Sequence, residues 1–368
     1  MTTRPPSAPP HILVVRLGSM GDVIHALPAV AVLRDALPNA FIGWAIEERW
    51  RGLLAATPAG PQGCDQRGPH QPLVDAIHPV NTLAWRSAPF SDETWSEIAA
   101  ARRNLRARKY DVAIDFQGAV KSALIAAASG AERVIGFERP RERPAGLWYT
   151  HTVETTSAHV VGQNVELVRS IARADRTRRY ASITSSPPDF LPHDPAAERA
   201  CDDELRRRGI GDFAILNPGA GWGAKQWPPE SYGAVAAALR DMSLTSVINY
   251  GPGEDALAHS VERASHGAAQ AFPLSLPELI ALTRRARLFI GGDTGPTHLA
   301  AALHVPVVAL FGPTDPARNG PFATRSLVLR SGSSRTSYSH RRQSDEGLLS
   351  LTPEHVIAAA RSLLENPS

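Results

Sequence analysis

The sequence predicts an α/β protein made of two Rossmann-like α/β/α domains that face each other across a cleft. Two observations lead to this prediction. The 368 residues are 43% hydrophobic and 20% charged, which is typical of a globular chain long enough for two domains. Each half also opens with a buried strand, a glycine-containing turn and a helix. That succession is typical of a parallel sheet covered by helices.

The first half begins with a short apolar run rich in β-branched side chains, residues 11–17, which predicts a buried strand. A tight turn is expected over Gly18–Asp22, and proline, glycine and polar residues predict an exposed loop over 57–72. The other elements expected here are helices over 23–37, 93–108 and 120–129 and strands over 41–45 and 111–115.

The second half follows a proline-rich segment, residues 185–195, which is the expected linker. It is expected to contain strands over 213–217, 246–250, 288–291 and 305–311, a glycine-rich turn over 218–225, helices over 229–242, 276–285, 297–303 and 353–364, and a Ser/Arg-rich loop over 331–347. The predicted domains are therefore 1–185 and 186–352, followed by a C-terminal helix in 353–368. Ligands are expected at the carboxyl ends of the strands, in the cleft.

The charge is unevenly distributed along the chain. Residues 1–185 hold 22 Lys and Arg against 17 Asp and Glu, a net of +5, whereas residues 186–368 hold 17 against 19, a net of −2. An anionic partner is therefore expected on the first half. The basic clusters at 102–109 and 139–143 could bind such a partner, or they could be solvated surfaces with no partner. Neither has the interleaved aromatics or the fold signature of a nucleic-acid binder, so no nucleic-acid partner is expected.

Composition also narrows the cellular context. The two cysteines, Cys64 and Cys201, exclude a disulfide scaffold and a multi-cysteine zinc site. The longest near-apolar run, residues 23–33, is far shorter than the ~20 residues of a bilayer span. An intracellular, cytoplasmic protein is expected, and work at a membrane surface stays open.

Asp22 lies at the start of the first predicted helix, after the turn formed by Gly18, Ser19, Met20 and Gly21. This turn is not Gly-x-Gly-x-x-Gly, and no acidic residue follows about 20 positions on, which disfavours a nicotinamide enzyme. Asp22 could be a general base or a helix-capping residue. A helix N-terminus lowers the pKa of a carboxylate, so burial on substrate binding would have to oppose that effect.

Two glycine-rich turns in the second half favour anion binding. The first, residues 217–225, ends in Lys225, which could neutralise a phosphate; a purely structural turn is the alternative. The second, residues 291–298, should present free N–H groups at Thr294, Gly295 and Thr297 to an anion or a sugar hydroxyl. A plain capping turn is again the alternative.

Three further side chains of the second half are candidates for supporting roles. Asp293 could accept hydrogen bonds from sugar hydroxyls, and His298 is expected to be a buried histidine that supports the site. Glu254 follows a predicted strand and could bind a ribose diol, or be an exposed loop residue. No metal-ligand spacing, Asp-x-Asp motif or Gly-x-Ser-x-Gly turn occurs. We therefore expect no metal and no other cofactor, and a hydrolase of the Gly-x-Ser-x-Gly type is disfavoured.

Taken together, the sequence resembles the lipopolysaccharide heptosyltransferases of glycosyltransferase family 9, which have the two-domain GT-B fold. The resemblance covers roughly residues 11–330. Five segments in order carry it, namely residues 16–22, 115–122, 225–230, 292–299 and 312–316. The segment that begins at Gln117 is more similar to heptosyltransferase I than to heptosyltransferase II.

The resemblance implies an inverting transfer of L-glycero-D-manno-heptose from ADP-heptose to the Kdo of Kdo2-lipid A. Asp22 would be the catalytic base. Donor binding would involve Lys225, Glu254, Asp293, Thr294 and Gly295, with His298 in support, and acceptor binding would involve Ser19, Met20, Gly21, Gln117 and Lys121. The enzyme would be cytoplasmic and in peripheral contact with the inner membrane. Alternatives are another heptosyltransferase or sugar-nucleotide enzyme of this fold, and a non-catalytic nucleotide- or glycan-binding protein.

Overall fold

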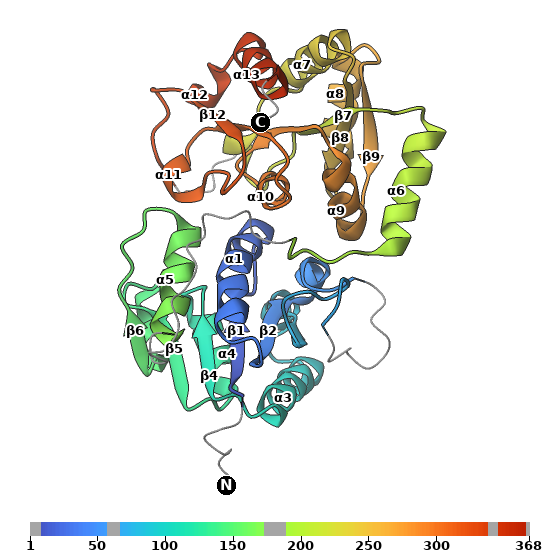
Figure 1. Ribbon diagram of the computed structural model, residues 1–368. Coiled ribbons are helices and arrows are strands. Elements are labelled where there is room, and N and C mark those ends of the chain that lie inside the picture. The colour runs from blue at the N-terminus through green and yellow to red at the C-terminus, as the bar shows by residue number, and fades with distance from the viewer. Residues whose placement is uncertain (1–8, 57–66, 173–188, 338–344, 366–368) are drawn as a thin grey trace. The chain divides into compact units, whose positions relative to one another are not determined.

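The computed structural model describes residues 9–56, 67–172, 189–337 and 345–365, and the chain divides into two compact units (Figure 1). The first unit is Met1–His193 and the second is Asp194–Ser368. Part of the predicted linker, residues 185–188, lies outside the described residues. In the rest of it, Phe190 and Leu191 are buried, so this end of the segment is anchored in a core and is not an exposed connection.

The first unit is built on a parallel sheet of six strands in the order β3-β2-β1-β4-β5-β6. The strands are β1 (His11–Val15), β2 (Phe41–Glu47), β3 (Ala76–Val80), β4 (Val112–Asp115), β5 (Arg133–Phe137) and β6 (His151–Val153). In the middle of the sheet, Leu13 is aligned with Gly43 on one side and with Ala113 on the other. The central strands are almost wholly apolar and buried, because helices cover both faces of a parallel sheet.

Helices form the outer layers of this unit. They are α1 (Met20–Ala36), α2 (Thr82–Ser87), α3 (Asp92–Ala107), α4 (Val120–Ala128) and α5 (Val160–Ala172), with short 3-10 helices η1 (Glu48–Leu53) and η2 (Arg143–Trp148). On one face, Leu13 and Val15 share a core with Leu105 of α3 and Ala126 of α4. Helix α1 packs against α5. Side chains of a strand alternate between the two faces of a sheet. Helices α3 and α4 cover one face and α1 and α5 cover the other.

Several boundaries and elements of the first unit differ from the prediction. Helix α1 begins at Met20, so Met20 and Gly21 lie in its first turn and the expected turn ends at Ser19. Strands β3, β5 and β6 and helices α2 and α5 were not predicted. Strand β3 contains His78 and Pro79, and β6 has three residues, two of them exposed, so neither has the apolar pattern of a buried strand.

The second unit repeats this architecture with the strand order β12-β11-β10-β7-β8-β9. The strands are β7 (Phe213–Asn217), β8 (Thr245–Tyr250), β9 (Ala269–Pro273), β10 (Leu288–Gly292), β11 (Val307–Phe311) and β12 (Ser326–Arg330). The helices are α6 (Pro195–Arg207), α7 (Pro229–Asp241), α8 (Asp255–Ala264), α9 (Leu276–Arg285), α10 (Gly295–Ala302), α11 (Pro316–Asn319), α12 (Glu346–Leu349) and α13 (Pro353–Glu365), with the 3-10 helix η3 (Gly223–Lys225). One core joins the sheet to α7, α8 and α13, and another joins it to α6, α9 and α10.

Here too the structure corrects some boundaries. Helix α10 begins at Gly295, two residues before the predicted start at Thr297. Helix α12 lies at the end of the expected loop 331–347, of which residues 338–344 are outside the described residues. The C-terminal helix α13 packs on α7 within the second unit, so it forms part of that unit's core. Strands β9 and β12 and helix α6 were not predicted.

The two sheets share one strand order, in which the first and fourth strands are neighbours at the centre. These are β1 and β4 in the first unit and β7 and β10 in the second. From the first strand the chain adds strands in one direction along the sheet, and from the fourth strand it adds them in the opposite direction. Open α/β sheets bind ligands at such a switch point, at the carboxyl ends of the strands. Among the described residues, no helix is both long and apolar enough to cross a membrane.

Candidate functional site

In the first unit, Asp22 stands beside the carboxyl end of β1 and forms an ion pair with Arg16. The Arg16 Nη2 to Asp22 Oδ1 distance is 2.5 Å. Arg16 is itself buried and donates through Nη1 to the carbonyl oxygen of Phe116, directly after β4. The Asp22 side chain is 32% exposed, whereas that of Arg16 is 7% exposed. The guanidinium thus holds the carboxylate in place from below and leaves part of it accessible.

Asp22 also completes the start of α1. Its Oδ2 atom accepts from the backbone N–H of Ser19, the N-cap residue, at 3.0 Å, and from the Ser19 hydroxyl at 3.2 Å. Asp22 therefore has the helix-capping contacts that the sequence offered as the alternative to a general base. Burial on its own raises the pKa of Asp22, but Arg16 and the Ser19 donors outweigh it and the pKa lies below the ordinary value.

The turn before Asp22 is shaped by a close approach. A side chain at Gly18 would collide with Trp50, because a Cβ atom there would lie 2.8 Å from the indole nitrogen. Ser19 is exposed, whereas Met20 and Gly21 are buried in the first turn of α1. Of the three predicted acceptor contacts in this turn, Ser19 is therefore the one whose side chain is accessible.

The segment after β4 is organised by Asp115, whose role the sequence did not indicate. This fully buried carboxylate accepts from the backbone N–H of Gln117 at 2.8 Å, from the Ser122 hydroxyl at 2.9 Å and from the Tyr149 hydroxyl at 2.8 Å. Gln117 is also buried, and its Oε1 atom accepts from the backbone N–H of Leu17 at 3.0 Å. The segment is therefore tied to the end of β1, and Gln117 already supports the turn that carries Asp22.

Lys121 projects from α4 towards the end of β2. Its Nζ atom lies 3.3 Å from the Thr82 hydroxyl and 3.9 Å from Oε1 of the buried Glu47, and 40% of its side chain is exposed. Burial lowers the pKa of Lys121 more than Glu47 raises it. An ammonium in this position can bind an anion while it stays anchored to the sheet.

In the second unit, Lys225 and Asp293 form the corresponding pair at the switch point. Lys225 Nζ lies 2.6 Å from Asp293 Oδ2 and 3.0 Å from the Asp293 carbonyl oxygen. The ammonium also lies 4.6 Å from the centre of the Trp222 ring. A lysine ammonium has three N–H donors, and among the described residues two of them face Asp293, so the third can serve a ligand. The structure therefore brings together two donor-site candidates that are 68 residues apart in the sequence.

His298 completes this cluster from the first turns of α10. Its Nε2 atom lies 3.1 Å from Asp293 Oδ1, and both side chains are 6% exposed. Burial raises the pKa of Asp293, but His298 and Lys225 together outweigh it and hold the pKa well below its ordinary value. Asp293 is therefore a carboxylate that orients the lysine and the histidine, and His298 is buried as the sequence led us to expect.

The N-terminus of α10 lies beside this cluster. Thr294 is the N-cap residue, and the backbone N–H groups of Gly295 and Thr297 fall in the first turn, where intrahelical partners are lacking. Thr294 Oγ1 accepts from Nδ2 of Asn217 at 3.3 Å. Asn217 ends β7, so this contact ties the helix start to the neighbouring strand. An α-helix start of this kind attracts anions.

Glu254 stands at the start of α8, after β8. Its Oε2 atom accepts from the backbone N–H of Gly251 at 2.8 Å. A Cβ atom at Gly219 would lie 2.1 Å from the same oxygen, so this glycine, in the turn after β7, leaves space for the carboxylate. Glu254 is thus held next to the glycine-rich turn that leads to Lys225, and ligand binding by it stays a prediction.

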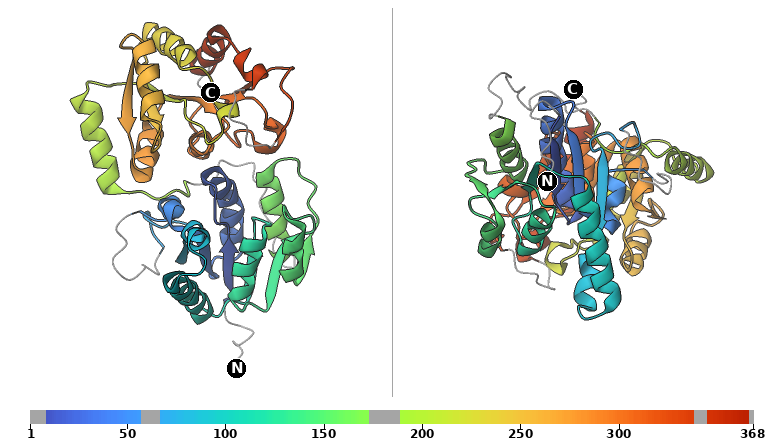
Figure 2. Two further views of the ribbon diagram at one scale, coloured as in Figure 1. Left: turned by 180° about the vertical axis from the view of Figure 1, so that it is seen from behind. Right: turned by 90° about the horizontal axis from the view of Figure 1, so that it is seen from below.

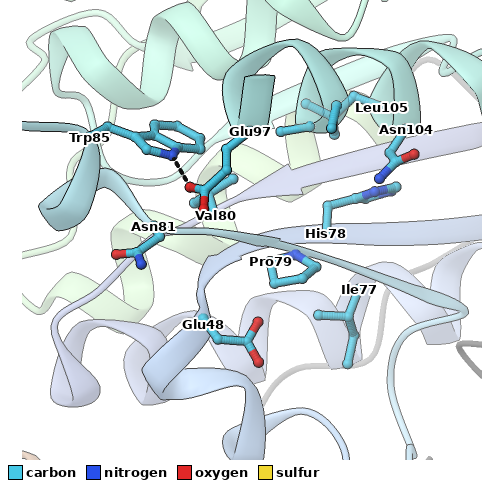
Figure 3. A pocket seen from close by; sticks show the side chains of 12 residues that line it. Glu48, Ile77, His78, Pro79, Val80, Asn81, Trp85, Glu97, Asn104 and Leu105 are labelled. Atoms are coloured by element: carbon cyan, nitrogen blue, oxygen red, sulfur yellow. Dashed lines mark hydrogen bonds between the residues drawn. The ribbon is translucent and has the colours of Figure 1, made fainter. Parts of the chain in front are cut away.

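A cavity of about 330 Å³ opens in the first unit, away from Asp22, at the carboxyl end of β3 (Figure 3). It lies between β3 and α3 and is lined by His78, Trp85, Glu97 and Asn104 among others. The Trp85 indole donates to Glu97 Oε2 at 2.8 Å across its mouth (Figure 3). Within the residues that the structure describes, no group of three His, Cys, Asp or Glu side chains is arranged to hold a metal ion.

Comparisons with known proteins agree with this architecture. Residues 98–349 match glycosyltransferase family 9 (heptosyltransferase). Lipopolysaccharide heptosyltransferase 1 of Escherichia coli is 28% identical over 334 residues, which cover 87% of this chain and 91% of that protein. Lipopolysaccharide heptosyltransferase 3 of Escherichia coli is 30% identical over 356 residues, 94% of this chain and 96% of that protein.

Solved structures extend the similarity to the fold. The E. coli heptosyltransferase WaaC with ADP-2-deoxy-2-fluoro heptose is 25% identical and superposes with a TM-score of 0.71 over 96% of this chain and 99% of that chain. The E. coli heptosyltransferase II structure, at 20% identity, has a TM-score of 0.73 over 96% of this chain. The predicted two-domain α/β fold is confirmed.

Proposed function

The chain belongs to glycosyltransferase family 9, the heptosyltransferases, and we propose that it transfers the heptose of ADP-heptose to the Kdo sugar of Kdo2-lipid A. The general activity, a lipopolysaccharide heptosyltransferase, follows from the family match and from relatives that span nearly the whole chain. The proposal concerns the specific donor, the acceptor and the residues that act. The observation that carries it is the pair of charged sites at the two switch points.

On the donor side, the cluster of Lys225, Asp293 and His298 favours a nucleotide diphosphate. Asp293 accepts from Lys225 at two atoms, so a third N–H donor of the lysine can bind a phosphate oxygen. The backbone N–H groups in the first turn of α10 can bind further phosphate oxygens. A relative with this fold binds an ADP-heptose analogue, which supports ADP-heptose as the donor here. Glu254, beside the glycine-rich turn, would accept from ribose hydroxyls, and Thr294 would donate to the ligand.

On the acceptor side, Asp22 would act as the base. It would take the proton of the Kdo hydroxyl while that oxygen forms a bond to the anomeric carbon of the heptose. The bond from this carbon to the diphosphate would break with inversion, and ADP would leave with the bonding electrons. Lys225 and the α10 N-terminus would stabilise the negative charge that develops on ADP. The chain's own residues therefore supply both the proton acceptor and the charge stabilisation.

Asp22 has a low pKa in the free protein because of Arg16 and Ser19, so it is ionised and able to accept a proton at neutral pH. A low pKa also makes it a weak base. An acceptor that covers the exposed side of the carboxylate would remove its remaining water and raise its pKa, which is the direction that proton transfer requires.

Lys121, Ser19, Met20, Gly21 and Gln117 would form the acceptor side. Lys121 supplies a partly exposed ammonium, which fits the carboxylates and phosphates of Kdo2-lipid A. Met20, Gly21 and Gln117 are buried, so their role would be to shape the site. Ser19 and Lys121 would contact the acceptor directly. Because the acceptor is a lipid, the enzyme would work in the cytoplasm, in peripheral contact with the inner membrane.

Another lipopolysaccharide heptosyltransferase, with a different acceptor, is the second candidate, since a heptosyltransferase 3 is as similar in sequence as a heptosyltransferase 1. We place the first transfer ahead because the segment from Gln117 to Ser122 is more similar to heptosyltransferase I than to heptosyltransferase II. The test is incubation of the purified protein with ADP-heptose and either Kdo2-lipid A or the same acceptor already carrying heptose, followed by mass spectrometry. Addition of one heptose to Kdo2-lipid A alone is the expected result. Transfer to the heptosylated acceptor alone would contradict the proposal.

A further inference from the structure

We propose that the α2–α3 hairpin of the first unit, residues 82–107, is an interfacial anchor that binds the surface of an anionic lipid bilayer. The membrane contact itself rests on the proposed function, because a lipid acceptor is named there. The assignment of a surface does not follow from that function. It comes from side chains of the hairpin that the donor and acceptor sites leave unused.

The hairpin exposes large apolar side chains in a short stretch of chain. Phe90, in the connection between the two helices, is 94% exposed, Trp95 is 61% exposed and Leu83 is 44% exposed. Phe90 and Trp95 are the two aromatic side chains among the exposed large hydrophobic residues that the structure describes. Burying such side chains is strongly favourable, and large apolar side chains that are exposed within one short stretch of the chain favour an interaction site.

Helix α3 presents one of these side chains, Trp95, on a face that carries two arginines. Trp95, Ala99, Arg102 and Arg106 follow a spacing of four, three and four residues and therefore share one stripe of the helix. Glu97, Ala101, Asn104 and Leu105 lie on the opposite stripe and line the cavity against β3 (Figure 3). The first stripe is thus turned away from the sheet. In the right-hand view of Figure 2, the cyan segment that carries these helices projects from the rest of its unit.

The charge of this surface indicates which partner covers it. The hairpin itself, residues 82–107, holds four Arg against three Asp and Glu, a net of +1, and Arg108 and Lys109 directly after α3 raise the net charge of the segment to +3. Arg86, Arg102 and Arg103 are exposed. Of the acidic residues, Glu97 lies on the cavity face and accepts from Trp85, and Asp92 and Glu93 are in the first turn of α3, where they favour the helix.

Aromatic side chains beside arginines fit the boundary between water and acyl chains. Aromatic rings reside at the headgroup level, and arginines are attracted by anionic headgroups within a Debye length. Trp95 and Arg102 are seven residues apart, which is about 10 Å along the helix. Both can therefore meet one bilayer surface when α3 lies parallel to it.

The test is flotation of the full-length protein with vesicles of phosphatidylcholine alone and of phosphatidylcholine with phosphatidylglycerol. We expect tighter binding to the anionic vesicles and weaker binding as salt rises. The double variant Phe90→Ser/Trp95→Ser should lose about tenfold or more in vesicle affinity. Leu349→Ser, at a side chain that is 49% exposed on α12 of the second unit, is the matched control and should bind as the wild type.

The basic part of the surface is tested with Arg102→Gln/Arg103→Gln. This variant should lose affinity for anionic vesicles and respond less to salt, since fewer charges are screened. Its control is Arg199→Gln/Arg361→Gln, which removes two exposed arginines from α6 and α13 and should leave binding unchanged. Far-UV circular dichroism and Tm establish that each variant is folded.

Unchanged vesicle binding of Phe90→Ser/Trp95→Ser, or an equal loss in Leu349→Ser, would overturn the proposal. A change of the double variant from dimer to monomer on size exclusion, with no change in flotation, would assign the surface to a second copy of the chain instead. Failure here is separable from failure of the proposed function. The double variant should transfer heptose to a deacylated, water-soluble acceptor at the wild-type rate, whereas a wrong acceptor assignment would abolish that turnover in the wild type too.

Discussion

At the switch point of the first unit, the buried member of the ion pair is the cation Arg16, with 7% of its side chain exposed, and the more accessible member is Asp22, with 32% exposed. In the second unit the order is reversed: Asp293 is buried with 6% exposed, and Lys225 is the more accessible with 14%. The two units share one strand order. The same scaffold therefore holds an accessible carboxylate in one place and an accessible ammonium in the other.

The difference fits the roles that we propose for the two units. A buried charge is costly unless it is paired and hydrogen-bonded, so each buried partner holds its counterpart at a fixed position. Arg16 fixes a group that can accept a proton, and Asp293 fixes a group that can bind phosphate. We infer that the buried member in each pair is a positioning residue and that the accessible member acts on the substrate.

The largest effect expected from this comparison concerns Asp22→Asn. Asparagine keeps the size of the side chain but cannot take a proton, so kcat should fall by about 10²–10⁴-fold, the usual contribution of a general base. Donor affinity should be nearly unchanged, because the donor candidates lie in the other unit. The measurement is steady-state turnover of ADP-heptose together with calorimetric titration with ADP.

Asp75→Asn is the matched control for that experiment. Asp75 also forms an ion pair at 2.5 Å, with the buried Arg34, in the same unit. It lies just before β3, away from the carboxyl ends of the strands. This control should lower the Tm and leave kcat near the wild-type value. Equal losses of kcat in the two variants would show that Asp22 acts through stability and not as a base.

The second largest effect is on stability and concerns Asp293→Asn. Removal of one partner of a buried pair costs about 3 kcal/mol in the free energy of unfolding, because Lys225 and His298 lose their common carboxylate. Asp22→Asn leaves the buried Arg16 guanidinium without its carboxylate, but Asp22 is itself partly exposed and Arg16 keeps its bond to the Phe116 carbonyl oxygen, so the cost should be smaller, about 1–2 kcal/mol. Urea unfolding of both variants at neutral pH measures the contrast. A larger cost for Asp22→Asn would reverse our ranking of the two pairs.

The pH dependence sharpens this second prediction. The folded-state pKa of Asp293 lies below the ordinary value of 3.8, so its stabilisation is complete well above pH 3.8. It is lost progressively as the pH falls below that value and through the folded-state pKa. The stability gap between wild type and Asp293→Asn should therefore be widest near neutral pH and narrow in acid. A gap that is constant between pH 7 and pH 3 would show that the charge is not its cause.

How well the sequence predicts the two charged sites depends on how far apart in the chain the interacting residues lie. The turns before Asp22 and His298 could be placed because each joins a buried strand to a helix within a few residues. The partner of Lys225, in contrast, is 68 residues away, and no local pattern specifies which carboxylate will meet it. Asp115 was missed for a similar reason, since its partner Tyr149 belongs to a segment that shows no strand or helix period.

Most of the strands that the sequence missed lie at the edges of the sheets, and β5, an interior strand of the first unit, is the exception. Strands β3, β6, β9 and β12 are the outermost strands. Polar side chains in β6 and the prolines in β3 and β9 weaken the apolar pattern that made β1 and β7 recognisable. Most of the central strands, and with them the turns that lead to Asp22 and His298, were therefore predictable, whereas the cavity at β3 and the α2–α3 hairpin were not.

The third effect, of intermediate size, separates the two lysines. Lys225→Ala should weaken binding of ADP by about 1.5–3 kcal/mol, the range for a hydrogen bond to a charged group, and leave acceptor affinity little changed. Lys121→Ala should do the reverse, and acceptor affinity should fall as salt rises, because exposed charges are screened. Calorimetric titration of each variant with ADP and with a deacylated acceptor distinguishes the two.

Two results would contradict the division between the units. If Lys121→Ala lost ADP binding while Lys225→Ala kept it, the two sites would be assigned the wrong way round. If both variants lost both ligands and also unfolded at lower urea concentrations, the lysines would be structural. Lys225→Arg adds a control, since a guanidinium keeps the charge but its planar fork fits the pocket of Asp293 and Trp222 differently.

The smallest effect is expected from chelation. In the proposed mechanism, Lys225, held by its two contacts with Asp293, and the first turn of α10 supply the positive charge opposite the departing diphosphate. Turnover of the wild type should therefore be unchanged by EDTA. The same assay on Lys225→Ala tests the reason, because loss of the ammonium should lower the rate with and without EDTA alike. A strict requirement for Mg²⁺ or Mn²⁺ in the wild type would show that the charge opposite ADP does not come from the chain. The accessible ammonium of the second unit would then not have the role that the comparison with the accessible carboxylate of the first unit gives it.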